Sequence, residues 1–229
     1  MGGLYGHGLA MMLVPMYVHP AADPGAWRAL AAAADRLYGV VLNVADGPGG
    51  SPDPAFASAA RDLRAAGVAV LGYADLDYGR RPQREVLDDL DRHRAWYDVD
   101  GFLFDQAPDQ AAWLRACKRL VKAARARGGR TVVLNPGVHP APGYASVADL
   151  VITFEGDWEA YCRAPAAPAW TSGHPAERFC HLVHGVPPGL CSVAGRTARL
   201  RGAAVHCAVT GHGRNPWSVL PPALKEPSP

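Results

Sequence analysis

Residues 101–135 read GFLFDQAPDQAAWLRACKRLVKAARARGGRTVVLN, and this stretch is the most informative about the architecture. It opens and closes with short apolar runs of the kind that form parallel strands covered by helices. Between these runs the sequence predicts a helix that begins at Asp109 and ends at the pair Gly128–Gly129. The apolar residues of this helix recur on one face, at Leu114, Cys117, Val121 and Ala124. The stretch therefore predicts a strand, a crossover helix and a second, parallel strand.

The same alternation of strands and helices continues on both sides of this unit. Eight strands are expected, at Leu13–Val18, Val40–Val44, Ala69–Tyr73, Gly101–Asp105, Thr131–Asn135, Leu150–Glu155, Phe179–Val183 and Ala203–Val209. In a chain of 229 residues this pattern predicts a single α/β barrel of the (β/α)8 TIM type, with some short or irregular outer helices. A doubly wound open sheet is the rival fold. It requires a glycine-rich phosphate turn after the first strand, and the residues after Val18 do not form one.

The sequence supports the predicted helices to different degrees. Asp53 is a suitable N-cap and Pro54 a suitable first helical residue, and Gly67 ends that helix. The segment after the fifth strand is rich in proline, which predicts only a turn or two of helix there. We place the barrel at residues 13–220, after an irregular leader at 1–12 and before a proline-rich tail at 221–229.

Composition excludes several classes of protein. With 49% hydrophobic and 19% charged residues, the chain buries a sizeable core, which excludes intrinsic disorder. A net charge of +2 gives no electrostatic reason to expect a nucleic acid or membrane partner. The five cysteines include no CxxC pair, which indicates reduced thiols. Since neither a membrane span nor a secretory signal is evident, we expect a cytoplasmic protein, or a secreted one if the N-terminus is incomplete.

Two of the predicted strands end in a carboxylate. Active sites of such barrels lie at the carboxyl ends of the strands, where this chain places Asp105 and Glu155. Side chains alternate along a strand, so Asp105 shares a face with Leu103. The same parity predicts that Val151, Thr153 and Glu155 all point into the barrel. The alternative is that each acid only caps a helix or pairs with an arginine at the rim.

The expected separation of the two acids indicates a type of chemistry. Strands four and six are two strand spacings apart, about 9–10 Å, so inward-leaning carboxylates approach to roughly 5–6 Å. That separation favours a retaining glycosidase without excluding an inverting one. Other strand-end residues are candidates for binding the substrate, and the aromatic ones offer flat faces for sugar rings. These candidates are Tyr17, His19, Asn43, Tyr73, Asp75, Gln106, Asn135, His184 and Trp217.

Three segments carry a resemblance to a known family. LVPMYVHP (13–20), FLFD (102–105) and VITFEG (151–156) resemble the spherulation-specific family 4, the spherulin-4-like proteins. That family is similar to the endo-α-1,4-galactosaminidases of glycoside hydrolase family 135, which act on a polymer of galactose and N-acetylgalactosamine. The resemblance implies a (β/α)8 barrel in which Asp105 is the nucleophile and Glu155 the general acid/base, or the reverse. It also implies a carbohydrate as the partner.

Other readings of the sequence remain open. Members that this chain resembles often carry Asp-Glu at the end of strand four, where it has Asp105 and Gln106, so a barrel that binds glycan without cleaving it is one alternative. A second is an enzyme acting on a phosphorylated metabolite, because glycines 211 and 213 follow the last strand. An acidic rim of Asp46, Asp75 and Asp77 would suit the ammonium group of a de-N-acetylated galactosamine. We expect no metal and no organic cofactor, since the histidines and cysteines lack metal-site spacing. The sequence leaves the oligomeric state open.

Overall fold

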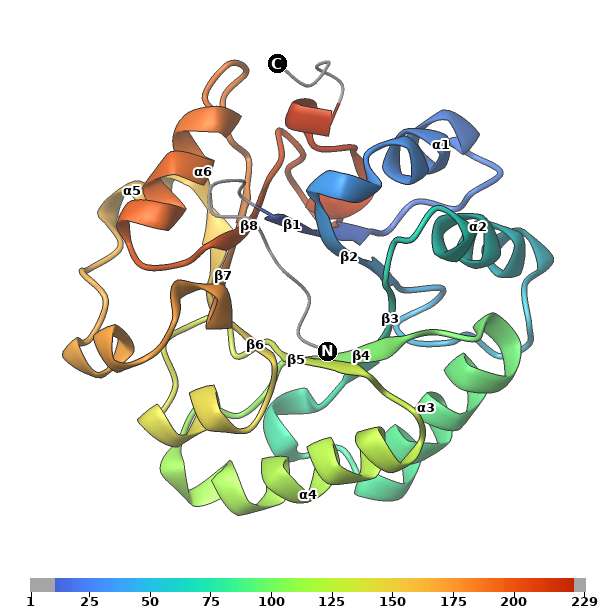
Figure 1. Cartoon of the computed structure of the whole chain (residues 1–229), viewed down its shortest axis with the longest axis horizontal. Helices are drawn as coiled ribbons and strands as arrows, with labels where there is room; N and C mark the ends of the chain where they lie inside the picture. The colour runs from blue at the N-terminus through green and yellow to red at the C-terminus, as the bar shows by residue number, and fades with distance from the viewer. Residues whose placement is uncertain (1–10, 225–229) are drawn as a thin grey trace.

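The fold is a closed barrel of eight parallel strands inside a layer of helices (Figure 1). The computed structural model describes residues 11–224. Each strand pairs with the next in chain order, and β8 pairs with β1 to close the barrel. The strands are β1 (Met11–Met16), β2 (Leu37–Leu42), β3 (Val70–Asp75), β4 (Gly101–Asp105), β5 (Thr131–Leu134), β6 (Leu150–Asp157), β7 (Phe179–His184) and β8 (Val205–Ala208). The predicted (β/α)8 barrel is confirmed.

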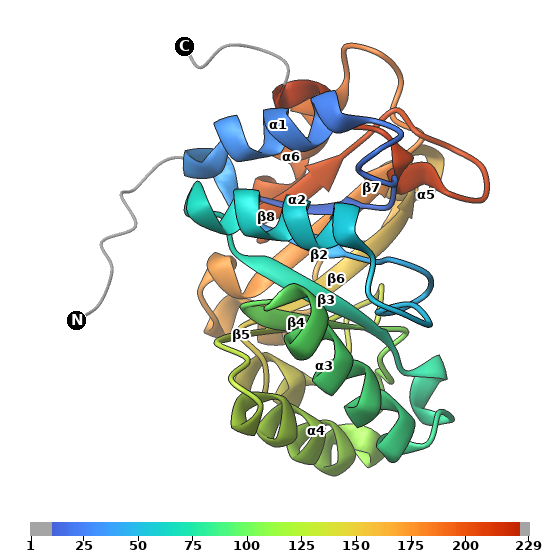
Figure 2. The same cartoon turned by 90° about the vertical axis from the view of Figure 1, so that its right-hand side faces the viewer.

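The outer layer consists of regular α-helices after β1 to β4 and of shorter or 3₁₀ helices between most of the later strands. The α-helices of the described residues are α1 (Pro24–Ala32), α2 (Pro54–Ala65), α3 (Gln83–Tyr97), α4 (Leu114–Ala126), α5 (Trp158–Arg163) and α6 (Cys191–Leu200). Figure 2 shows α1 to α4 stacked one beside the next along one flank of the barrel. As predicted, Asp53 caps α2, and its carboxylate accepts from the N–H groups of Ala55 and Phe56. Between β5 and β6 the chain forms only the 3₁₀ helix Pro142–Ser146. None of the helices within residues 11–224 has the length and apolar character needed to cross a membrane.

The ends of the barrel differ from the predicted limits. β1 begins at Met11, inside the stretch predicted as an irregular leader, because Met11 and Met12 pair with β8. At the other end, Leu224 is buried in the main core, although it lies in the predicted tail. Residues 1–10 and 225–229, which complete the predicted leader and tail, lie outside the described residues.

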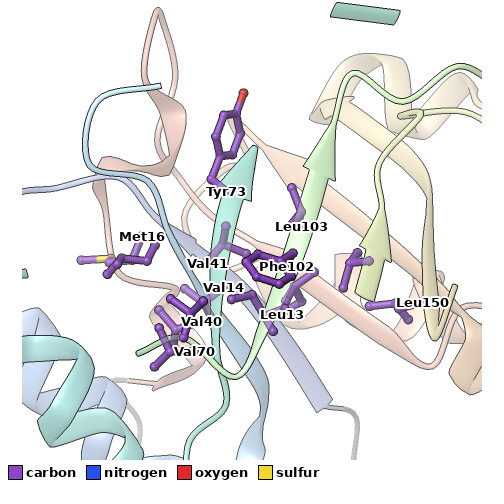
Figure 3. Packing of buried hydrophobic residues seen from close by; sticks show 14 of the residues in the cluster. Leu13, Val14, Met16, Val40, Val41, Val70, Tyr73, Phe102, Leu103 and Leu150 are labelled. Carbon is purple, nitrogen blue, oxygen red and sulfur yellow. The ribbon is translucent and has the colours of Figure 1, made fainter. Parts of the chain in front are cut away.

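Alternate side chains fill the interior of the barrel, and the others face the helices. On β4, Leu103 pairs in register with Tyr73 of β3, so the two share a face, and Figure 3 shows the Tyr73 hydroxyl pointing away from the apolar side chains below it. Phe102 faces the helical layer, because a Cβ on Gly129, just after α4, would lie 2.9 Å from its ring. The expected parity of β4 is therefore correct. It directs Asp105 to the mouth of the barrel.

The parity predicted for β6 is wrong at its start. Val151 packs in an outer cluster with Phe179 of β7 and Ala198 of α6, and the next residue, Ile152, packs in the main core. The register with β7 then shifts, because Ile152 and Phe154 pair with successive β7 residues and Thr153 has no partner between them. This bulge adds one residue to β6 and reverses the alternation. Glu155 consequently faces the inner pocket although Val151 faces outward.

A glycine on β3 makes room for a buried histidine. A Cβ on Gly72 would lie 2.6 Å from Cγ of His93, which is fully buried in α3 and bonds through Nε2 to the carbonyl of Tyr73 at 2.8 Å. We expect Gly72→Ala to lower the free energy of unfolding by about 1–3 kcal/mol, because the packed ring must move. Denaturant unfolding measures the change, with Gly173→Ala as the control, since nothing lies within 4 Å of a Cβ there. Equal stability of the two variants would contradict the prediction.

Candidate active site

Asp105 and Glu155 meet in one pocket at the mouth of the barrel. The pocket has a volume of about 510 Å³ and lies at the carboxyl ends of the strands. Both acids contribute to its wall, Asp105 from the end of β4 and Glu155 from near the end of β6. The other side chains that matter for its chemistry are Tyr17, Asn43, Asp46, Tyr73, His184, Arg214, Asn215 and Trp217.

One amide group joins the two acids. Nδ2 of Asn135, which directly follows β5, donates to Oδ1 of Asp105 at 2.6 Å and to Oε2 of Glu155 at 2.5 Å. Because both oxygens lie within hydrogen-bond length of the same nitrogen, they are at most about 5 Å apart. The carboxylates are therefore as close as the sequence predicted. A separation of at most about 5 Å is well below the roughly 6.5–9.5 Å of inverting glycosidases.

Asp105 is surrounded by hydrogen-bond donors. The hydroxyl of Tyr73 donates to its Oδ2 at 2.8 Å, while Oδ1 accepts from Asn135. Burial raises the pKa of Asp105 above its usual value, and the bonds from Tyr73, the backbone of Gln106 and Asn135 oppose that rise. Burial also raises the pKa of Tyr73, which keeps its hydroxyl protonated as a donor. The three donors favour the ionised form of Asp105, while burial, the larger effect, leaves its pKa raised overall.

Glu155 is the more easily protonated of the pair. Burial, and next the charge of Asp105, raise its pKa from the usual 4.5 to about 7, although donors on Asn135 and Trp217 partly oppose this. Trp217 donates from Nε1 to Oε1 at 3.2 Å. A carboxyl group with a pKa near neutrality can deliver a proton and later recover it. The two acids thus have environments suited to different roles.

The loop after β8 holds Trp217 over the pocket by bonding to the chain after β1. The N–H of Tyr17 donates to the carbonyl of Trp217 at 3.0 Å, and Nδ2 of Asn215 donates to the carbonyl of Tyr17 at 2.8 Å. Gly211 lets the loop fold tightly, since a Cβ there would lie 2.0 Å from the carbonyl oxygen of Pro216. Asn215 was not predicted as a site residue. Its polar side chain in the loop after the last strand is the signal that could have found it.

The structure places the predicted substrate-binding residues in three positions. Tyr17, Asn43, Tyr73, His184 and Trp217 line the pocket with the two acids. Asn135 lies behind the carboxylates and is only 5% exposed.

His19, Asp75 and Gln106 lie outside the lining. Nε2 of His19 lies 3.0 Å from Oδ2 of Asp53. Oδ1 of Asp75 accepts from the N–H of Asp77 at 2.8 Å. Gln106 has a backbone φ of 47°, and its carbonyl accepts from the N–H of Tyr78 at 2.8 Å. Gln106 is thus absent from the lining, while its backbone N–H donates to the carboxylate of Asp105.

The predicted acidic rim is divided in the same way. Asp46 lines the pocket. Asp77 instead pairs with Arg80 at 2.5 Å, and this exposed pair lies away from the lining. Of the three rim acids, Asp46 is the one placed to meet a bound molecule.

A second pocket lies on the outer side of β6, against α5. Its volume is about 530 Å³, and its lining is mainly apolar, with Phe154 and Tyr161 among its residues. Glu155 borders this pocket as well, but both its carboxylate oxygens bond to residues of the inner site, Asn135 and Trp217. The chemistry of the two acids therefore belongs to the inner pocket.

The raised pKa of Glu155 predicts how stability changes with pH. The folded state holds the proton up to about pH 7 and the unfolded state only to about 4.5. The protonated carboxyl therefore contributes about 3 kcal/mol to the free energy of unfolding below pH 4.5, and this contribution is lost as the pH rises to about 7. We expect Glu155→Gln to remove that loss and to raise the melting temperature more at pH 8 than at pH 4. Thermal unfolding at the two pH values measures this, with the exposed Glu177→Gln as the control. An equal effect of Glu155→Gln at both pH values would refute the prediction.

Comparison with known proteins connects this barrel to a family. The model of the spherulation-specific family 4 matches residues 11–226. Spherulin-4 of Physarum polycephalum is 31% identical over 149 residues, which cover 63% of this chain and 44% of that protein. The chain therefore spans less than half the length of this curated relative.

Two solved structures are similar to the barrel as a whole. The crystal structure of Aspergillus clavatus Sph3 in complex with GalNAc superposes with a TM-score of 0.81 at 24% identity and covers 95% of each chain. A chitinase from Rhizomucor miehei gives a TM-score of 0.53 at 13% identity, covering 94% of this chain and all of that one. At these levels of identity the likeness shows the shared fold.

Proposed function

The chain belongs to the spherulation-specific family 4, and from that premise and the geometry of its paired acids we propose that it is a retaining glycoside hydrolase. The proposed substrate is an α-linked glycan that contains galactosamine, as a polysaccharide or an oligosaccharide. The observation that carries the proposal is the single amide of Asn135 that holds Asp105 and Glu155 within about 5 Å of each other. The GalNAc bound by the structurally similar Sph3 supports an amino sugar as the substrate.

In the proposed mechanism Asp105 is the nucleophile and Glu155 the general acid and base. An oxygen of the Asp105 carboxylate attacks the anomeric carbon, and the bond from that carbon to the leaving sugar oxygen breaks. Glu155 gives its proton to that oxygen in the same step. The resulting ester removes the negative charge of Asp105, so one cause of the raised pKa of Glu155 disappears. Glu155 then accepts a proton from water, the water oxygen bonds to the anomeric carbon, and the Asp105 carboxylate is released.

The lining of the pocket fits a sugar ring. Tyr17 and Tyr73 meet edge to face with ring centroids 5.9 Å apart, and His184 meets Trp217 edge to face at 5.8 Å. These rings supply apolar surface around the two acids, while Asn43 and Asp46 supply polar groups for sugar hydroxyl or amino substituents.

The test is cleavage with a defined stereochemical outcome. The protein is incubated with galactosaminogalactan and with α-1,4-linked N-acetylgalactosamine oligosaccharides, and new reducing ends are counted. Proton NMR of the first product then reports its anomeric configuration, which we expect to be α because two displacements retain it. A first product in the β configuration would exclude retention. Saturable binding without new reducing ends would instead support a barrel that holds glycan without cutting it.

A further inference from the structure

The amide of Asn135 has one possible orientation between the two acids. Its Oδ1 accepts from the N–H of Gly137 at 3.0 Å, so Nδ2 faces the carboxylates. The reverse orientation would place an acceptor against two carboxylates and a donor against an N–H group. The backbone of Asn135 is fixed as well, because it donates to the carbonyl of Phe104 and accepts from the N–H of Ala107.

An NH₂ group can only donate, and this restricts where protons can lie. Its two hydrogens are used by Oδ1 of Asp105 and Oε2 of Glu155. Each of these oxygens must therefore offer a lone pair toward Asn135. On Asp105 the other oxygen, Oδ2, also accepts, from the hydroxyl of Tyr73. All four carboxylate oxygens accept a hydrogen bond from a side chain, and the bond from Trp217 to Oε1 of Glu155, at 3.2 Å, is the longest of them. Oε1 is therefore the oxygen whose electrons are least engaged by a donor, and it is the site that best accommodates a shared proton.

We infer that Asn135 is a positioning residue that assigns the proton of the acid pair: it keeps Oδ1 of Asp105 and Oε2 of Glu155 deprotonated and places the transferable proton on Oε1 of Glu155. This inference rests on the proposed function for its role in catalysis, while the proton assignment itself concerns the free protein. In the first step Oε1 gives this proton to the leaving sugar oxygen as the glycosidic bond breaks. In the second step Oε1 recovers a proton from the attacking water, so Glu155 returns to its starting state.

The surroundings of Glu155 contain further groups that influence its proton. Asp105 of β4 is the nearest charged group and favours the protonated form of Glu155. Trp217 of the loop after β8 donates to it. The titratable groups around it on the other strands and loops include Tyr17, Tyr73, Cys180, His184 and Cys207, and the charged groups across the pocket are Asp46 and Arg214. Burial raises the pKa of Tyr17 and both thiols and lowers that of His184, so all four are neutral at pH 7.

The first experiment measures proton affinity without any substrate. Carbon-13 NMR follows the side-chain carboxyl groups of Asp105 and Glu155 through a pH titration of the wild type and of Asn135→Ala. Loss of the shared donor should raise the proton affinity of Glu155 about tenfold, one pKa unit, and should also raise that of Asp105. Tyr73→Phe is the matched variant, because its hydroxyl bonds to Asp105 alone. It should raise the pKa of Asp105 without raising that of Glu155.

The second experiment locates the proton directly. Neutron diffraction from a deuterium-exchanged crystal of the wild type at pH 5 should show deuterium on Oε1 of Glu155 and on neither oxygen that faces Asn135. Deuterium on Oε2, or an unchanged pKa of Glu155 in Asn135→Ala, would overturn the inference. Because neither measurement needs turnover, a protein that failed to cleave any glycan would refute the proposed function and leave the proton assignment to stand or fall separately. The neutron measurement also decides the matter if Asn135→Ala does not fold.

Discussion

Asp105→Asn is expected to lower the rate of cleavage of the amino-sugar glycan by about 10⁴-fold or more, because it removes the carboxylate that we propose as the nucleophile. An amide at this position keeps the size of the side chain and can still contact Asn135 and Tyr73. It carries no negative charge with which to attack the anomeric carbon. Initial rates of reducing-end formation measure the loss, and equilibrium binding of an oligosaccharide shows that the pocket is retained.

The neighbouring acid Asp109 provides a matched control for this change. It lies in the loop that follows β4, is exposed, and is absent from the lining of the pocket. Asp109→Asn should therefore cleave glycan at close to the wild-type rate. If Asp105→Asn kept more than about a tenth of the wild-type rate, Asp105 would not be the nucleophile. A severe loss in both variants would point to misfolding rather than to chemistry.

Glu155→Gln is expected to show a loss that depends on the leaving group. With a natural sugar as leaving group, the missing proton should cost about 10²–10⁴-fold in rate. With an aryl glycoside whose phenolate leaves without a proton, the first step should be largely preserved, and the later hydrolysis of the ester should become limiting. A rapid burst of phenol followed by slow turnover is the expected signature. Equal losses on both substrates would contradict the role of Glu155 as general acid.

The pH profile provides a second readout of Glu155. The proton donor must be protonated, so wild-type activity should fall as the pH rises through about 7, where burial and the charge of Asp105 place the pKa of Glu155. The residual first-step activity of Glu155→Gln on the aryl glycoside should lack this alkaline fall. A wild-type profile that rises through pH 7 would refute the assignment.

The sequence was sufficient to predict the parts of the molecule that follow a simple period. β4 was predicted with its observed limits, Gly101 to Asp105, because its five residues alternate regularly between the two faces of the sheet and no bulge interrupts them. The helix capped by Asp53 was predictable because a cap and a proline define its start locally. The placement of Asp105 at the mouth of the barrel followed from the alternation along its strand and from its position at the carboxyl end of that strand.

Other features depend on contacts between distant segments. The bulge at Thr153 arises from the register of β6 on β7, and alternation along one strand gives no sign of it. The inward orientation of Glu155 was predicted correctly, but the inward orientation of Val151 at the start of the same strand was not, because the bulge between them reverses the alternation. Asn135 was predicted to touch substrate, but the structure places it behind the acids, a position set by Phe104, Ala107 and Gly137 together. The exclusion of His19 from the pocket likewise reflects a partner 34 residues away.

The bonds between the loop after β8 and the chain after β1 have a consequence for biosynthesis. Tyr17 is among the first of the described residues to leave the ribosome, and Trp217 is among the last. The wall of the pocket near Glu155 is thus completed only when the two extremes of the barrel meet. A nascent chain therefore acquires most of its strands before the loop after β8 can complete this wall, and the pocket is finished in one step with closure of the ring.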